Sequence, residues 1–363
     1  MINQQNYLDV KKFLVFQRDT RQNTKGSLES EYYRLVYLLK WADAKSFEEA
    51  KTIKPTFPAV MEKRTNYLGM PLKAETLQGI CKVCRAFFEY CKLSFPGRYK
   101  KIDYNFIQGL RPSRGRSMQS ELVTRKIYKV EDIRKLIACP AESLAEKRMR
   151  AAVAFLFISG MRIGAFMTLP LDCVDMAKRR VMQLPIKGVK TKNSKAAITY
   201  MLNIPDLVKV AREWDSFLRT SLPENAYWYA YLDNLQQLTT NFEGRKNAEG
   251  GRQEFNKDLK AFCERAGVEY LSAHKLRHGH AVYALKAASK PSDMKAISMN
   301  LMHSNIGITD GIYGKLVADD VQTAIEGLTA DKGDGEDEME KKLREMLKKM
   351  LKEGDGDGDG KGN

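Results

Sequence analysis

Long apolar runs are absent from this sequence. No stretch approaches the roughly 18 uninterrupted apolar residues that a membrane-spanning helix needs, and the opening residues MINQQNYLDVKKFLVF lack the apolar run of an export signal. These absences argue against an integral membrane protein and against export by the usual route. We therefore expect a cytoplasmic protein that has no membrane partner.

Cysteine is scarce, and its six positions follow no regular spacing. This argues against a disulfide framework of the kind found in small exported domains. The element CKVC offers half of a zinc site, but no second Cys or His pair follows at the spacing of a zinc finger. Instead, the apolar side chains around it recur three or four residues apart, at Leu77, Ile80, Cys81, Cys84, Phe88 and Cys91. We interpret this segment as the buried face of a helix, with a metal site as the weaker alternative.

Histidine is rarer still, yet three of the four histidines of the chain lie in SAHKLRHGHAV. His274 and His278 could point the same way along a helix and bind zinc, but Lys275 stands where a zinc-protease helix has Glu. Arg277 shares a helical face with His274, so an imidazole and a guanidinium could donate together to a phosphate oxygen. We favour a phosphate over a metal ion, and we expect His278 and His280 to pack against neighbouring helices or to support the site.

Positive charge, in contrast, is abundant. The chain has 61 Lys and Arg against 45 Asp and Glu, a formal net charge of +16. Such an excess predicts a polyanionic partner, with nucleic acid as the first candidate and a ribosome-like or membrane surface as alternatives. Residues 331–363 carry eleven acidic and eight basic side chains, which leaves +19 on the preceding 330 residues. The body of the protein is thus more basic than the total suggests.

The length of 363 residues favours two domains of ordinary size. Apolar stripes at helical spacing in residues 1–110 predict an all-helical domain that clamps DNA. Residues 111–126, RPSRGRSMQSELVTRK, carry five positive charges among Pro, Gly and Ser, and predict a basic linker. Residues 127–328 mix helical patterns with short strands and predict an α+β domain with a small sheet. Residues 329–363 are expected to form a tail.

Within the second domain, YKVEDIRKLIA and MRAAVAFLFISG are typical of helices, and the second pattern ends at Gly160. We expect FMTLPLDCVDM to form a further helix that Pro170 breaks, and residues 179–205 to form strands joined by basic turns. The tail contains a short apolar stripe at helical spacing in EKKLREMLKKMLKE, which could serve as a docking arm. Its final GDGDGDG is more typical of disordered acidic sequence than of a calcium loop.

Three segments carry a family resemblance. SGMRIGAFMTLPLDCVD, HKLRHGHA and LMHSNIGITDGIYG resemble the signature boxes of the tyrosine recombinases, or phage integrases, in the order Arg, Lys, His-x-x-Arg, His, Tyr. The resemblance covers roughly residues 127–320 and is nearer to archaeal and viral integrases than to eukaryotic members. It implies the tyrosine recombinase catalytic fold, which is mainly helical with a small antiparallel sheet. It also implies that residues 1–110 form the core-binding half of a DNA clamp.

Transferred position by position, the resemblance makes Arg162 the first catalytic arginine, His274 and Arg277 the His-x-x-Arg pair, His303 the later histidine and Tyr313 the nucleophile. These residue types suit the chemistry, because the pentacoordinate transition state of phosphoryl transfer gains negative charge that arginine and imidazole donors stabilise. A tyrosine phenol is both a nucleophile and a leaving group, so the covalent link keeps the bond energy for rejoining strands.

The general acid of the family is a lysine in a basic hairpin, and Lys192 fits this role in VKTKNSKAAITYMLNIP. Lys187, Lys190 and Lys195 are its alternatives. The sequence departs from the family pattern at Ala165, where an acidic residue is common. It also departs in the distance from His303 to the nucleophile, which is one residue longer than in many relatives.

The resemblance thus implies a site-specific DNA recombinase that cuts and rejoins strands through a 3′-phosphotyrosyl intermediate, with no cofactor and no metal ion. The expected partners are double-stranded DNA with a specific recombination site and further copies of the chain, which form a homotetramer on DNA and can be monomeric in solution. A role in a mobile genetic element and association with the nucleoid follow. Two alternatives are a type IB topoisomerase-like DNA relaxing enzyme and a catalytically inactive DNA-binding relative.

Overall fold

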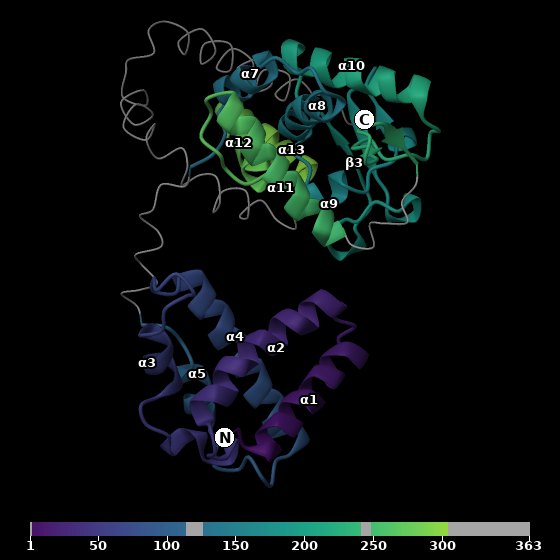
Figure 1. Cartoon of the computed structure of the whole chain (residues 1–363). Coiled ribbons are helices and arrows are strands. Elements are labelled where there is room, and N and C mark those ends of the chain that lie inside the picture. Colours follow the sequence, from purple (N-terminus) through teal and green to yellow (C-terminus); the bar gives the residue numbers. More distant parts are fainter. Residues whose placement is uncertain (1, 114–125, 241–247, 304–363) are drawn as a thin grey trace, which may run out of the picture. The chain divides into compact units, whose positions relative to one another are not determined.

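The computed structural model describes residues 2–113, 126–240 and 248–303 (Figure 1). The chain divides into two compact units, Met1–Val123 and Thr124–Asn363. Each unit has its own cluster of buried apolar side chains. The boundary between the units falls inside the basic segment that the sequence predicts to be a linker. Among the described residues, no helix is both long and apolar enough to cross a membrane.

The first unit is helical in its described part. Its elements are α1 (Gln4–Asp19), α2 (Lys25–Ala42), η1 (Phe47–Thr52), α3 (Phe57–Glu62), α4 (Ala74–Ser94) and α5 (Tyr104–Gly109). Helices α1, α2 and α4 pack against one another around the apolar cluster. The predicted stripe of α4 lies in this core, where Leu77, Ile80, Cys84 and Phe88 are all buried. This confirms the helix that the CKVC segment predicts.

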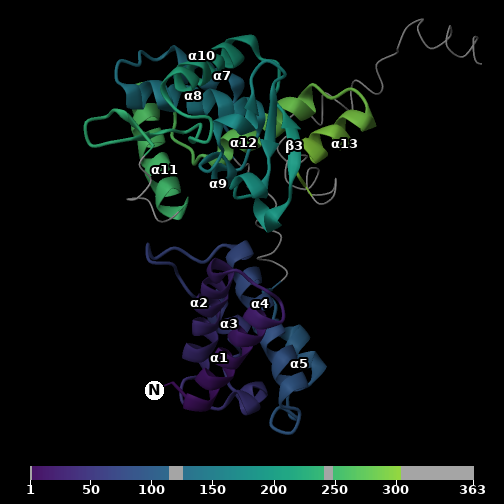
Figure 2. The ribbon, with the colours of Figure 1, turned by 90° about the vertical axis from the view of Figure 1, so that its right-hand side faces the viewer.

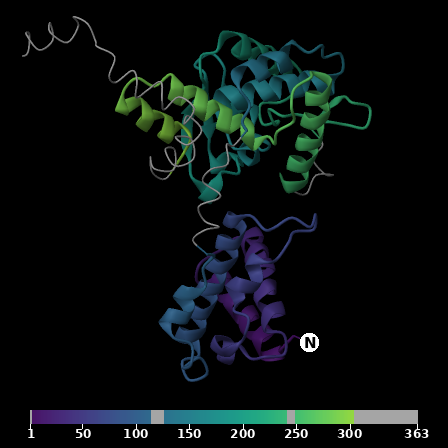
Figure 3. The same ribbon diagram turned by 90° about the vertical axis from the view of Figure 1, so that its left-hand side faces the viewer.

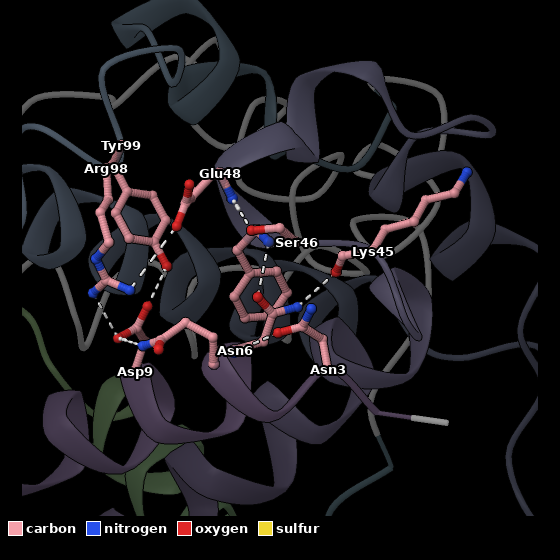
Figure 4. A network of polar contacts seen from close by, with 10 residues as sticks. Asn3, Asn6, Asp9, Lys45, Ser46, Glu48, Arg98 and Tyr99 are labelled. Carbon is pink, nitrogen blue, oxygen red and sulfur yellow. Dashed lines mark hydrogen bonds and ion pairs between the residues drawn. The ribbon is translucent and has the colours of Figure 1, made fainter.

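A buried polar network fastens α1 to the rest of the first unit (Figure 4). The carboxylate of Asp9 accepts hydrogen bonds from the hydroxyl of Tyr99 at 2.7 Å and from Nη2 of Arg98 at 2.9 Å. One turn earlier, the side chain of Asn6 accepts from the backbone N–H of Phe47 and donates to the carbonyl of Lys45, each at 2.8 Å. A buried carboxylate is tolerated when such donors surround it, so the network fixes the position of α1.

The second unit is built around one buried helix. Its helices are α7 (Val130–Ala138), α8 (Leu144–Ser159), α9 (Ile163–Phe166), α10 (Pro205–Ser221), α11 (Ala248–Arg265), α12 (His274–Lys286) and α13 (Pro291–Asn300). Every residue from Ala151 to Ser159 is buried, which is the pattern of a helix covered on all sides. Helices α7, α10 and α12 pack directly on α8. Figure 2 labels these helices, and Figure 3 gives the view of the unit from the opposite side.

A small antiparallel sheet lies beside these helices. Strands β1 (Val174–Asp175), β2 (Arg180–Gln183) and β3 (Ala197–Tyr200) follow one another in space in that order. A separate hairpin pairs β4 (Tyr231–Leu232) with β5 (Leu238–Thr239). In its described part, the protein is therefore an α+β protein that is mainly helical and has a small antiparallel sheet, as the sequence predicts.

The prediction of a broken helix over FMTLPLDCVDM is wrong. Helix α9 ends at Phe166, the first residue of this segment, which then forms a 3-10 turn, η2 (Leu171–Cys173), and β1. Pro170 has no backbone N–H to continue a helix, and it pairs as an isolated bridge with Tyr227. The next residue, Leu171, donates its N–H to the carbonyl of Ala226 at 2.9 Å. The segment is thus held by a distant part of the chain that a local pattern does not reveal.

Candidate active site

The site begins where α8 ends. Ser143 and Glu146 form a capping box at the start of α8, and Gly160 ends the helix in a left-handed conformation with φ of 60°. A Cβ on Gly160 would lie 2.5 Å from Cδ2 of the buried His280, so no other residue fits without displacement. This tight turn leads directly into Arg162, which is the residue preceding α9.

Helix α12 brings the His-x-x-Arg pair to the same place. The helix approaches the segment before α7 so closely that a Cβ on Gly279 would lie 2.1 Å from the carbonyl oxygen of Tyr128. Tyr128 in turn donates its hydroxyl to the carbonyl of Leu271 at 2.5 Å and accepts from the N–H of Leu271 at 2.7 Å. These contacts fix the first turn of α12, from which His274 and Arg277 project.

Arg277 joins three separate segments of the chain. Its guanidinium is buried and donates to the carbonyl of Gly160 at 2.6 Å and to the carbonyl of Leu301 at 2.5 Å. A third contact of 3.0 Å links Nη2 of Arg277 with Nε2 of His303. Because a guanidinium can only donate, Nε2 of His303 is the acceptor and the proton of the neutral ring lies on Nδ1. The end of α8, the start of α12 and the segment after α13 therefore meet at one side chain.

Both histidines of this group are held in the neutral form. Partial burial lowers the pKa of His303 to about 4, and the nearby charges of Arg277 and Arg162 contribute to the shift. His274 is exposed at the start of α12, yet desolvation of its ring by the surrounding protein lowers its pKa, followed by the charges of Arg277, Arg162 and Lys275. Arg162 thus lies close enough to act electrostatically on both imidazoles. The structure brings these four predicted residues together.

The two remaining histidines pack behind this group. Nδ1 of His280 donates to the carbonyl of Phe157 at 2.8 Å, and complete burial lowers the pKa of His280 to about 4. His278 is buried, and its ring meets the ring of His274 edge to face, with the centroids 4.6 Å apart. Both histidines have the packing role that the sequence predicts. In the described part of the chain, no three His, Cys, Asp or Glu side chains form a cluster that could hold a metal ion.

The basic hairpin between β2 and β3 carries the candidate lysines. The hydroxyl of Thr168 accepts from the backbone N–H of Lys190 at 2.9 Å, which ties the hairpin to the turn after α9. Lys187 forms an ion pair of 2.8 Å with Asp172, and this contact raises the pKa of Lys187. Lys190, Lys192 and Lys195 are exposed. Lys192 is not among the hydrogen-bond partners of Arg277. The ion pair with Asp172 makes Lys187 less available than Lys192 to donate a proton.

The predicted nucleophile, Tyr313, lies outside the described residues. Sequence reasoning missed the two backbone carbonyls, of Gly160 and Leu301, that hold Arg277. For the carbonyl of Gly160 a signal was available, because this glycine directly follows a long apolar helix and lies two residues before Arg162. Chemically, two guanidinium groups and two neutral imidazoles present positive charge and hydrogen-bond donors on one side of the unit. Such a group is suited to binding a phosphate.

The sequence also matches a known protein family. The sequence pattern of the phage integrase family matches residues 126–319, which is more than half of the chain. The chain belongs to the phage integrase family.

Among the curated relatives of this chain is the tyrosine recombinase XerC-like protein of Caldanaerobacter subterraneus subsp. tengcongensis. It is 26% identical over 220 residues, and the match covers 54% of this chain and 52% of the relative. Tyrosine recombinase XerC of Actinobacillus pleuropneumoniae is 24% identical over 329 residues, with 87% and 92% covered. The chain therefore spans about half the length of the first relative and most of the second.

Solved integrase structures share the fold. The crystal structure of a lambda integrase dimer, residues 75–356, bound to a COC′ core site has a TM-score of 0.59 and 13% identity, and the match covers 85% of this chain and 94% of that one. A lambda integrase tetramer bound to a Holliday junction has a TM-score of 0.58 at the same identity, with 84% and 76% covered. At this identity, the likeness shows only that the chain shares the fold of these structures.

Proposed function

We propose that this member of the phage integrase family is a site-specific DNA recombinase that cuts and rejoins strands through a 3′-phosphotyrosyl intermediate. The observation that carries the proposal is the buried guanidinium of Arg277, which holds His303 at 3.0 Å beside the charge of Arg162. Such an arrangement, fixed before any substrate binds, supplies preorganised donors for the charge that develops on a phosphate during transfer. The family membership of the chain supports the same chemistry.

In the proposed reaction, the phenol of Tyr313 loses its proton to the solvent, its oxygen attacks the scissile phosphorus, and the bond from phosphorus to the 5′ oxygen breaks. Lys192 delivers a proton to the departing 5′ oxygen, and Arg162, Arg277, His274 and His303 stabilise the phosphorane. The reverse step uses the 5′-hydroxyl of a partner strand, which attacks the phosphotyrosine and releases the phenol. Bonds to phosphorus are exchanged one for one, so the reaction needs no external energy source.

We further propose that residues 1–110 form the core-binding half of a DNA clamp. This stretch carries nineteen basic and eleven acidic side chains, a net charge of +8, which favours the phosphate backbone. The segment 111–126 would link the two halves of the clamp, residues 127–328 would form the catalytic domain, and residues 329–363 would form the tail. As lambda integrase does on a Holliday junction, four copies would assemble on DNA.

The proposal is tested by incubating the wild-type protein and Tyr313→Phe with sheared DNA from the source of the protein in excess EDTA. Covalently attached DNA is then trapped under denaturing conditions and sequenced. We expect adducts from the wild type alone, clustered at one sequence, while Tyr313→Phe still binds DNA. Adducts scattered over all sequences would instead support a type IB topoisomerase-like enzyme, and retained cleavage by Tyr313→Phe would remove the assigned nucleophile.

A further inference from the structure

Asn300, the last residue of α13, connects this helix to the sheet. Its Oδ1 accepts from the backbone N–H of Tyr200 at 2.7 Å, and its Nδ2 donates to the backbone carbonyl of Tyr200 at 2.9 Å. One side-chain amide thus satisfies both backbone groups of the last residue of β3, much as a neighbouring strand would. Helix α13 lies beside β3 in the second unit, as Figure 2 shows.

In this contact between α13 and the sheet, the end of β3 is the more tightly held side. Tyr200 pairs with Arg180 of β2. The next two residues are anchored as well, because Met201 donates to the carbonyl of Arg179 and Leu202 donates to the carbonyl of Ile158 in α8, each at 2.8 Å. Since α8 is the most deeply buried helix of the unit, the end of β3 is fixed to the core.

Helix α13, in contrast, is attached more lightly. Its C-terminal neighbour Leu301 packs in a small apolar cluster with Ala281 and Val282 of α12, separate from the large core of the unit. A small contact of this kind restrains the end of the helix less than a core position does. The two hydrogen bonds of Asn300 therefore contribute a large part of what sets the end of α13 relative to the sheet.

The residues after Asn300 belong to the candidate active site. The carbonyl of Leu301 and Nε2 of His303 both accept from the guanidinium of Arg277. Between them, Met302 has a left-handed backbone with φ of 52°, and the N–H of His303 donates to the carbonyl of Ser298 at 3.1 Å. This short turn transmits any displacement of the end of α13 directly to the imidazole of His303.

We propose that Asn300 is a positioning residue, which locks the end of α13 to the sheet and thereby holds His303 against Arg277. The inference rests on the proposed function as far as catalysis is concerned, because His303 matters for the reaction only if the site transfers a phosphoryl group. Asn300 itself binds β3, so it acts through His303.

A first test needs no DNA. The chain has only four histidines, so the titration of His303 can be followed by NMR in the full-length protein, with His303→Gln for assignment. In the wild type, partial burial of the ring and, after it, the charge of Arg277 keep the pKa of His303 at about 4. We expect Asn300→Ala to raise this pKa toward the ordinary value of 6.5. The matched control Asn203→Ala removes another surface amide of the same unit and should leave the pKa unchanged. An unchanged pKa in Asn300→Ala would overturn the proposal.

A second test uses single-turnover cleavage of a DNA site recovered with the wild type. Asn300→Ala should cleave roughly 10- to 100-fold more slowly, because misplacement of a catalytic group by about 1 Å has an effect of this size. Asn300→Asp keeps the acceptor for the N–H of Tyr200 but loses the donor to its carbonyl. Its cleavage rate should therefore lie between those of Asn300→Ala and the wild type. Thermal unfolding of each variant shows whether the second unit remains folded. Equal cleavage by folded Asn300→Ala and wild type would contradict the positioning role.

A substrate with sulfur in place of the bridging 5′ oxygen identifies the group through which Asn300 acts. A thiolate leaves without a proton, so this substrate should restore cleavage by Lys192→Ala and should not restore cleavage by Asn300→Ala. Restoration of Asn300→Ala would mean that Asn300 acts through the hairpin lysine, which overturns the proposal.

If the wild type cleaves no DNA at all, the proposed function fails, while the NMR result still decides whether Asn300 positions His303.

Discussion

The substitution Gly160→Ala should lower the free energy of unfolding of the second unit by more than the cost of placing an alanine at the positive φ of residue 160. Gly160 has φ of 60°, and an alanine held there costs about 1–2 kcal/mol. The new Cβ would also lie 2.5 Å from Cδ2 and 2.8 Å from Nε2 of His280. His280 is buried and donates to the carbonyl of Phe157, so it has little freedom to move. Overpacking of this kind costs a further 1–3 kcal/mol or so, which gives a total loss of about 2–5 kcal/mol.

Gly188 provides a matched control for this prediction. Its φ is 86°, but a Cβ there would meet nothing within 4 Å, so Gly188→Ala should cost only the backbone term of about 1–2 kcal/mol. The assay is urea unfolding followed by tryptophan fluorescence in a Trp41→Phe background, which leaves Trp214 and Trp228 as reporters in the second unit. Equal losses for the two glycine variants would refute the argument from the collision with His280.

Three further predictions concern other contacts. Arg277→Lys should slow single-turnover cleavage roughly 100-fold or more, because one ammonium group cannot hold both carbonyls and His303; cleavage at the wild-type rate would contradict this. His303 and His280 have pKa values of about 4, below the ordinary 6.5, so the unfolded chain binds more protons between these pH values. The free energy of unfolding should therefore be highest above pH 6.5 and should fall as the pH drops toward 4. If urea unfolding gave the same free energy over this pH range, the two rings would not be held neutral. Asp9→Ala should destabilise the first unit by roughly 1–3 kcal/mol, because the hydroxyl of Tyr99 loses its acceptor in a buried place; calorimetry of the first unit should show the loss.

The helical framework could be predicted from local pattern alone. The spacing from Leu77 to Cys91 indicates α4, and the apolar run that ends at Gly160 indicates α8, because a core-facing side repeats every three to four residues. The small sheet could also be predicted from the basic, strand-like sequence before Pro205. The segment around Pro170 could not, because its conformation depends on hydrogen bonds to a part of the chain more than fifty residues away.

The candidate site shows the same division between local and long-range information. Residue types and their order single out Arg162, His274, Arg277 and His303, and the structure places all four close together. The sequence does not reveal the contacts that hold these residues in place. The carbonyl of Gly160 lies 117 positions from Arg277, and Tyr200 lies 100 positions from Asn300. No periodicity or motif marks such pairs, because they arise only when separate helices and strands have packed.

We propose that Tyr313 forms the covalent link to DNA, and this assignment can be measured directly. Wild-type protein is allowed to react with a DNA fragment that carries its recovered site, the adduct is digested with protease and nuclease, and the modified peptide is sequenced by mass spectrometry. We expect a nucleotide attached through a 3′-phosphate to Tyr313 and to none of the other fifteen tyrosines of the chain. Attachment at any other residue would contradict it.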